Sequence, residues 1–189
     1  MRICFFGDSF INGTGDDSAL GWVGRVAASA RHQGKDVTLY NLGIRGETGE
    51  ELEARWHEEA QRRNPERLLF SFGANDCHRR VPPDRTVAAM GRILREAAAL
   101  APTIVIGPIP VLDDGETDAL IVKLSAAQQK LCRELAVPFL SVHGFIGVCD
   151  AWKDSAADND GSHPNQGGYE ALAQFLLEWS GLRRWLGIR

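Results

Sequence analysis

The chain has 189 residues, of which 44% are hydrophobic, and it carries 21 basic and 25 acidic side chains for a net charge of −4. This size and composition predict one globular domain over residues 1–189, with a core that needs no disulfide or metal for its stability. The acidic balance argues against a nucleic-acid-binding module, which presents an excess of basic side chains on one face. No apolar run approaches the roughly 18 residues of a membrane span.

The N-terminus lacks the pattern of an export signal, because only residues 3–6 form an apolar run before Gly7 and Asp8 interrupt it. We therefore expect a cytoplasmic protein. In a reducing compartment, cysteines without a Cys-x-x-Cys pair are expected to be small buried hydrophobic residues. This expectation applies to Cys4, Cys77, Cys132 and Cys149, although Cys77 lies close enough to a polar segment to line a pocket.

Short apolar runs alternate with amphipathic helical stretches along the chain. Five runs are predicted as strands, at residues 2–7, 37–42, 67–72, 103–106 and 138–142. The first, third and fourth are almost continuously apolar, as in strands that helices cover on both faces. Helical stripes are predicted over residues 20–30, 52–60, 87–98, 120–135 and 169–179, the second with a capping box at Thr48 and Glu51. The repeated alternation predicts an α/β sandwich around a parallel sheet.

Two connecting segments, residues 113–118 and 148–160, are predicted as loops. The second is longer than the usual connection in a compact domain, so it is either disordered or functional. The segment from Trp179 to Trp185 is compatible with packing within the chain or across a homodimer.

Polar, glycine-containing segments follow the predicted strands. In open parallel sheets, ligands bind beyond the carboxyl ends of the strands, so these segments are expected to meet at one edge. They are Gly7-Asp8-Ser9-Phe10 after the first strand, Asn41 to Thr48 after the second, Gly73-Ala74-Asn75-Asp76 after the third, and Asp160 to Asn165 well beyond the fifth.

These segments hold the groups that acyl transfer requires. Ser9, at the turn from strand to helix, is the candidate nucleophile, and His163 is the candidate base because a neutral imidazole can accept and return a proton near neutral pH. Asp160 lies three residues before His163, within reach of its imidazole. The candidate oxyanion donors are the N–H groups of Ser9 and Gly46 and the amide of Asn75.

Together the four segments resemble the four sequence blocks of the GDSL, or SGNH, hydrolases, in the family's order and over nearly the whole chain. The resemblance implies that Ser9 is the nucleophile, His163 the base, Asp160 the third member of the triad, and Gly46 and Asn75 the oxyanion donors. It also implies a flavodoxin-like three-layer α/β/α sandwich with a five-stranded parallel sheet, and hydrolysis of acyl esters or thioesters with no metal or organic cofactor.

Two features of the blocks bear on this assignment. Phe10 stands where the family's name has Leu, which leaves the chemistry of Ser9 unchanged. Gly43 is a second candidate donor; Gly46 is preferred because it stands two residues before Thr48, as the family's donor does. In the flavodoxin-like strand order 2-1-3-4-5, Ser9 would lie between the Gly46 and Asn75 loops, and the long segment after His143 would bring His163 back to it.

Other classes of protein fit the sequence less well. A metal-dependent hydrolase could use Asp8, Asp76, His78, Asp160 and His163, but no characteristic ligand spacing is present, and Asp8 and Asp76 are expected to bond backbone N–H groups instead. A flavodoxin-like module for a nucleotide or flavin phosphate would need a glycine-rich phosphate loop, which the chain lacks. An α/β-hydrolase would need Gly-x-Ser-x-Gly around its nucleophile.

The predicted activity is therefore that of a serine esterase on a small-molecule ester with a short acyl group, since the chain has no spare domain to cover a long one. A carbohydrate O-deacetylase and an acyl-thioesterase remain alternatives with the same mechanism. We expect Arg45, Arg79 and Arg80 to favour an anionic or polar leaving group. The substrate site is expected to be lined by Phe10, Ile11, Val81, residues from 145–148 and Trp152.

Overall fold

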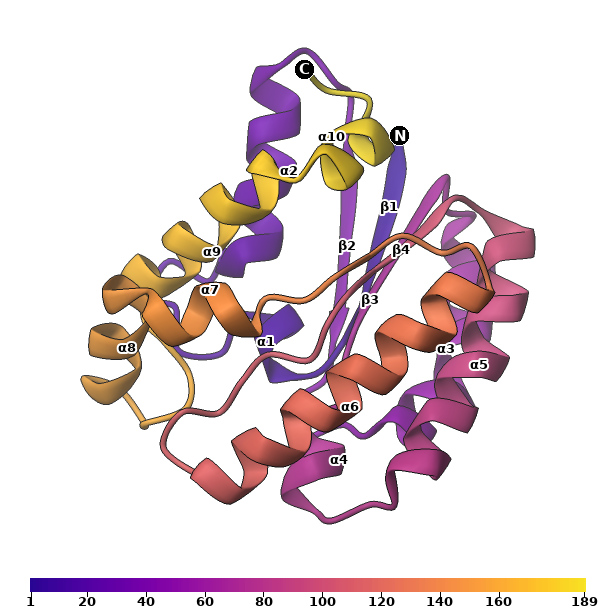
Figure 1. Ribbon diagram of the computed structural model, residues 1–189. Coiled ribbons are helices and arrows are strands. Elements are labelled where there is room, and N and C mark those ends of the chain that lie inside the picture. Colours follow the sequence, from indigo (N-terminus) through magenta and orange to yellow (C-terminus); the bar gives the residue numbers. More distant parts are fainter.

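The computed structural model describes residues 1–189 and is built on a five-stranded sheet in the order β2-β1-β3-β4-β5, in which every neighbouring pair is parallel (Figure 1). The predicted α/β class and strand order are confirmed. The strands are β1 (Arg2–Gly7), β2 (Thr38–Gly43), β3 (Arg67–Ser71), β4 (Thr103–Ile106) and β5 (Phe139–Leu140).

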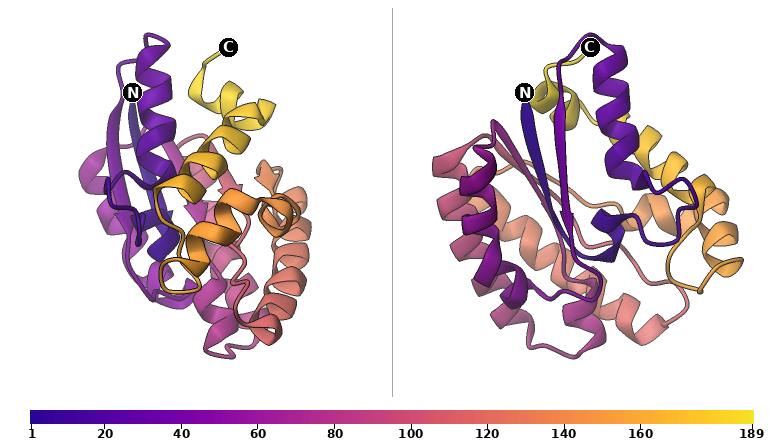
Figure 2. Two further views of the ribbon diagram at one scale, coloured as in Figure 1. Left: turned by 90° about the vertical axis from the view of Figure 1, so that its left-hand side faces the viewer. Right: turned by 180° about the vertical axis from the view of Figure 1, so that it is seen from behind.

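Helices connect the strands and cover both faces of the sheet, which gives three layers (Figure 2). The N- and C-termini lie at the same end of the molecule, near the amino ends of the strands. The helices are α1 (Ser9–Asn12), α2 (Gly21–His32), α3 (Gly49–Arg63), α4 (Ala74–His78), α5 (Pro83–Leu100), α6 (Gly115–Glu134), α7 (His143–Val148), α8 (Asp150–Ala157), α9 (Gln166–Glu178) and α10 (Ser180–Leu186).

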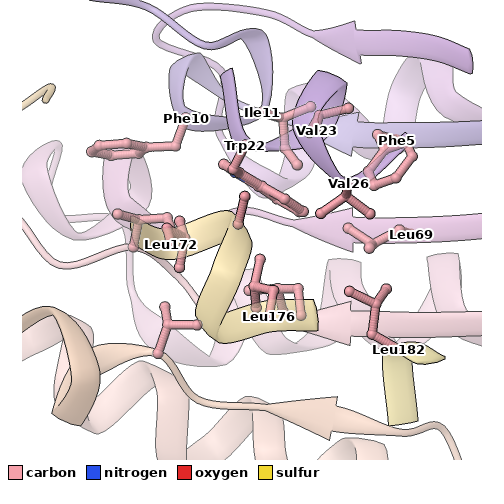
Figure 3. Close-up of a cluster of buried hydrophobic side chains, with 14 of the residues drawn as sticks. Phe5, Phe10, Ile11, Trp22, Val23, Val26, Leu69, Leu172, Leu176 and Leu182 are labelled. Carbon is pink, nitrogen blue, oxygen red and sulfur yellow. The ribbon is translucent and has the colours of Figure 1, made fainter. Parts of the chain in front are cut away.

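Alternate side chains of the central strands enter two separate cores, which explains why those strands are apolar on both faces. Ile3 and Phe5 of β1 pack with α2, α9 and α10 on one face, as Figure 3 shows for the labelled residues. Cys4 and Phe6 of the same strand pack with α3 and α5 on the other. The stripes predicted in α2, α3, α5 and α9 largely coincide with the buried faces of these helices, although Leu20, just before α2, is 48% exposed. The stripe over residues 120–135 is only partly correct, because α6 buries Ile121 and Leu124 but otherwise mainly polar residues and Cys132.

Local sequence fixes the ends of the elements at the carboxyl edge of the sheet. The turn after β1 requires glycine at position 7, because its φ is +155° and a Cβ there would lie 1.8 Å from the carbonyl oxygen of Ser71. Asp8 is the N-cap residue of α1, and its carboxylate accepts the N–H of Phe10 at 3.0 Å. The predicted capping box of α3 is present, with the N–H of Thr48 donating to Glu51 at 2.8 Å.

Three expectations about connections are wrong in detail. The segment 148–160 is mostly helical, because α8 buries Trp152 and Ala156, one turn apart, under α9. The segment 113–118 contains the start of α6, capped by the carboxylate of Asp114. The last strand is short, since only Phe139 and Leu140 pair with β4, and α7 begins directly after it, so the return toward β1 runs through two helices rather than a loop.

The C-terminal tryptophan segment packs within the chain. Trp185 is 6% exposed, packs edge-on against Phe5, and its indole N–H donates to the carbonyl of Pro102 at 2.8 Å. Across the whole structure, the helices are too short or too polar for any of them to traverse a bilayer.

Candidate active site

A serine, a histidine and an aspartate meet at the carboxyl edge of the sheet, although 154 residues separate the first two in the sequence. Nε2 of His163 lies 2.7 Å from Oγ of Ser9, and Nδ1 of the same ring lies 2.8 Å from Oδ2 of Asp160. Ser9 begins α1 directly beyond β1, and His163 lies in the turn between α8 and α9. The structure thus brings together the three residues that the sequence predicted as a triad.

The turn that carries His163 is built by its own aspartate. One carboxylate oxygen of Asp160 accepts the N–H groups of Ser162 at 3.0 Å and His163 at 2.7 Å, while the other contacts the imidazole. Burial raises the pKa of Asp160, but these hydrogen bonds outweigh it and hold the pKa below its ordinary value. Asp160 is therefore an anion at neutral pH, facing Nδ1 of His163.

Aromatic side chains of the core pack against the imidazole of His163. The ring of Phe10 lies 4.9 Å from that of His163, centroid to centroid, and 6.1 Å from that of Trp152. Trp152 in turn packs edge-on against Tyr169, whose hydroxyl donates to the carbonyl of Thr14 at 2.8 Å. Phe10 thus packs directly against the imidazole, while the contacts of the two ring nitrogens with Ser9 and Asp160 define the direction of the ring.

Ser9 opens onto a cavity of about 240 Å³ in which the candidate oxyanion donors also lie. The side-chain amide of Asn75 donates to the carbonyl of Glu47 at 3.1 Å, which joins the loop after β3 to the loop after β2. Gly46, in the loop after β2, has a φ of +81° that favours glycine. The walls are formed by Ser9, Phe10, Arg45, Gly46, Ala74, Asn75, His78, Val111, Ser162 and His163.

The two glycines after β2 occupy different environments. Gly43 packs against α1, since a Cβ there would lie 2.3 Å from the backbone nitrogen of Asn12, and its own N–H donates to Oδ1 of Asn41 at 3.1 Å. Gly46 lines the cavity, whereas Gly43 does not. The geometry therefore favours Gly46 over Gly43 as the candidate donor that faces the cavity.

Asp8 and Asp76 make the backbone contacts that were expected of them. Asp8 accepts the N–H of Phe10, and burial, with smaller contributions from Asp76 and Glu47, raises its pKa to about 7. Both oxygens of Asp76 accept the N–H of Gly49, at 3.1 and 3.0 Å, and one also accepts the hydroxyl of Thr86 at 2.8 Å. Burial raises the pKa of Asp76 as well.

These contacts bear on the metal-dependent alternative. No three His, Cys, Asp or Glu side chains of the structure are grouped so that they could hold a metal ion. The five side chains that this alternative requires are therefore not assembled into a ligand set: Asp8 and Asp76 face backbone N–H groups, and Asp160 faces His163.

The expected lining of the substrate site is only partly correct. Phe10 borders the cavity, but Ile11 and Trp152 are fully buried in the core behind it. Val81 borders a separate cavity together with Cys77, and Val148 is 76% exposed elsewhere on the surface. Periodicity cannot distinguish a core residue from a pocket residue, because both are apolar and lie beside the same segments.

The three arginines also differ in position. Only Arg45 lines the cavity; Arg79 donates to the carbonyl of Gly46 at 2.7 Å, and Arg80 donates to Thr117 at 3.1 Å and Glu116 at 3.2 Å. Sequence reasoning missed Val111, which follows β4 at the same edge and could have been found by extending the carboxyl-edge rule to that strand. Ala74 and Ser162 also line the cavity; both lie within predicted polar segments but were given no role of their own, and His78 was considered only as a metal ligand.

Comparison with known proteins shows the family and the fold of the chain. Residues 5–171 match the sequence model of the GDSL-like Lipase/Acylhydrolase family. Axe2, an acetylxylan esterase from Geobacillus stearothermophilus, has a similar structure at 20% identity and a TM-score of 0.78, over 100% of this chain and 94% of that one. The psychrotrophic esterase EstA from Pseudoalteromonas sp. is similar at 20% identity and a TM-score of 0.79, over 98% of each chain. A search of curated protein sequences finds no significant match.

Proposed function

The chain belongs to the GDSL-like lipase/acylhydrolase family and is a carboxylic ester hydrolase, and on this premise we propose that it is a serine esterase whose triad is Ser9, His163 and Asp160. The observation that carries the proposal is the continuous chain of contacts from Oγ of Ser9 to Nε2 of His163 at 2.7 Å and from Nδ1 to Asp160 at 2.8 Å. A hydroxyl becomes nucleophilic when an oriented base lies at this distance.

In the acylation step, Oγ of Ser9 attacks the ester carbonyl while Nε2 of His163 takes its proton. Asp160 keeps Nδ1 protonated and stabilises the imidazolium that forms, without accepting the proton itself. His163 then gives the proton to the leaving alcohol as the bond from the acyl carbon to the alcohol oxygen breaks. A water molecule, activated by the same imidazole, hydrolyses the acyl-Ser9 ester and restores the free hydroxyl.

The oxyanion of each tetrahedral intermediate is assigned to the N–H groups of Ser9 and Gly46 and the amide of Asn75. The support for this assignment is that all three residues line the cavity and that Gly46 has the left-handed conformation that lets the backbone approach a ligand closely. Loss of one such donor typically raises the barrier by about 3–4 kcal/mol.

We assign short acyl groups to the site because the cavity has only about 240 Å³. A second candidate is a carbohydrate O-deacetylase of the same mechanism, which is favoured by the fold it shares with an enzyme described as an acetylxylan esterase. A series of p-nitrophenyl esters of increasing chain length, acetylated sugars and an acyl-CoA thioester separates these activities from each other and from a thioesterase.

The mechanism is tested by the hydrolysis of p-nitrophenyl acetate by the wild type and the Ser9→Ala variant, each with and without EDTA. We expect Ser9→Ala to lose activity by at least about a thousandfold and EDTA to have no effect on the wild type. Ser141→Ala is the matched control, because its hydroxyl lies outside the cavity and should leave turnover unchanged. Activity that is lost on chelation but kept by Ser9→Ala would replace the serine mechanism by a metal-dependent one.

A further inference from the structure

The charges around the candidate active site are unevenly distributed, although the protein as a whole is acidic. The ten residues that line the cavity include Arg45 and the imidazoles of His78 and His163, but no aspartate or glutamate. In a protein with a net charge of −4, a cavity wall without a carboxylate is an attractive environment for an anion.

Among the arginines near the cavity, Arg45 is the one whose guanidinium makes no hydrogen bond. Its Nη2 forms an ion pair with Oδ2 of Asp160 at 3.8 Å, which is beyond hydrogen-bonding distance, and its side chain is 67% exposed. Arg79 and Arg80, by contrast, each donate to a backbone carbonyl and lie within 3.4 Å of a glutamate. Arg45 is therefore free to pair with a bound ligand without breaking a hydrogen bond of the protein.

The position of Arg45 also indicates which part of an ester it would meet. His163 must protonate the leaving oxygen, so the alcohol departs on the side of the imidazole. Arg45 lies on that side, next to the carboxylate that holds Nδ1 of the same ring. A negative charge on the alcohol portion, a few bonds from the ester oxygen, would approach the guanidinium.

We propose that Arg45 makes this enzyme selective for esters whose leaving group carries a negative charge, such as a carboxylate. The proposal rests on the serine mechanism proposed above and adds the class of its substrate. Attraction between Arg45 and the anion stabilises the bound ester and, through the same contact, the transition state. Arg45 thus acts as a specificity determinant through its charge.

The test compares two acetyl esters of nearly equal shape, the anion para-acetoxybenzoate and the neutral para-acetoxybenzamide. The quantity measured is the ratio of their kcat/KM values. We expect the wild type to favour the anion, Arg45→Gln to reduce the ratio by about fivefold, Arg45→Lys to retain most of it, and Arg45→Glu to invert it. The wild-type ratio should also shrink as the salt concentration is raised. Arg80→Gln is the matched control, because it removes the same charge from a side chain directed at α6 and should leave the ratio unchanged.

Several outcomes would overturn the proposal. One is a ratio that is the same in the wild type, Arg45→Gln and Arg45→Glu. Another is a preference for charge on the acyl side instead, seen as faster turnover of mono-p-nitrophenyl succinate than of p-nitrophenyl pentanoate without any preference for the anionic leaving group. The Ser9→Ala variant separates failure of the substrate assignment from failure of the serine mechanism. If Ser9→Ala abolishes turnover of both esters while the kcat/KM ratio does not change on substitution of Arg45, only the substrate assignment fails. Turnover that survives Ser9→Ala overturns both proposals.

Discussion

At the scale of single residues, the site is organised by side chains that serve structure and chemistry together. Asp160 closes the turn that carries His163 and also contacts its imidazole. Asp8 caps α1, so that Ser9 occupies the first position of a helix, where its hydroxyl meets His163. Because each aspartate is fixed by backbone N–H groups, the reacting side chains are held in position before a substrate binds.

The buried carboxyl of Asp8 predicts a pH-dependent contribution to stability. Burial raises its pKa from 3.8 to about 7, so the folded protein holds this proton more tightly than the unfolded chain does. The contribution of Asp8 to the free energy of unfolding is therefore fully present below its unfolded pKa and is lost as the pH rises through the folded one. We expect Asp8→Asn, which cannot ionise, to become more stable relative to the wild type by up to about 1.4 kcal/mol per pH unit in this window.

Urea denaturation of both proteins at several pH values between about 5 and 8 measures this difference directly. Asp17→Asn, at an exposed position on the same connection, controls for the loss of one negative charge. A difference between Asp8→Asn and the wild type that does not change with pH would show that Asp8 is already ionised in the folded protein at the lower end of the range.

At the scale of elements, the site depends on how two loops are joined. The loop after β2 carries Gly46 and the loop after β3 carries Asn75, and neither strand pairs with the other because β1 lies between them. The amide of Asn75 bonds the carbonyl of Glu47, and Asp76 bonds the N–H of Gly49. These two contacts set the distance across the cavity between the candidate oxyanion donors.

Asp76→Ala should therefore weaken both the fold and the activity. It leaves the buried N–H of Gly49 without an acceptor, which typically costs about 1–3 kcal/mol of unfolding free energy, and it removes one of the two contacts that join the Gly46 loop to the Asn75 loop. We expect a lower kcat for p-nitrophenyl acetate with a smaller change in KM. Thr86→Val is the matched control, since it removes only the hydroxyl bond to Asp76 and keeps the one to Gly49. A folded Asp76→Ala variant with a wild-type kcat would contradict this role.

At the scale of the whole molecule, the sheet separates two hydrophobic cores that lie on its opposite faces, of which Figure 3 shows part of the first. The prediction that all four cysteines are buried is correct for three of them: Cys4 and Cys132 lie in one core and Cys77 in the other. It is wrong for Cys149, which is partly exposed at the junction of α7 and α8. Burial raises the pKa of Cys4, Cys77 and Cys132 to about 12.

This distribution predicts the reactivity of the thiols. With a thiol-specific chromogenic reagent at neutral pH, the native protein should react quickly at Cys149 alone, and all four cysteines should react once the chain is unfolded in urea. The Cys149→Ser variant should show no rapid phase in the native state. Fast labelling of further thiols in that variant would mean that one of the cores opens under native conditions.

The alternation of strands and helices, the parallel sheet and the four polar segments at its edge could be predicted from the amino-acid sequence, because each of these follows from local periodicity, capping and the geometry of parallel strands. The sequence also predicted which serine, histidine and aspartate would meet. Three features became known from the folded structure alone: Gly46 rather than Gly43 faces the cavity, Val111 from the segment after β4 completes its wall, and Arg45 is the one of the three arginines that lines it. These outcomes depend on contacts between segments that are distant in the chain, and a side chain's direction is fixed by what packs against it, which no local pattern encodes.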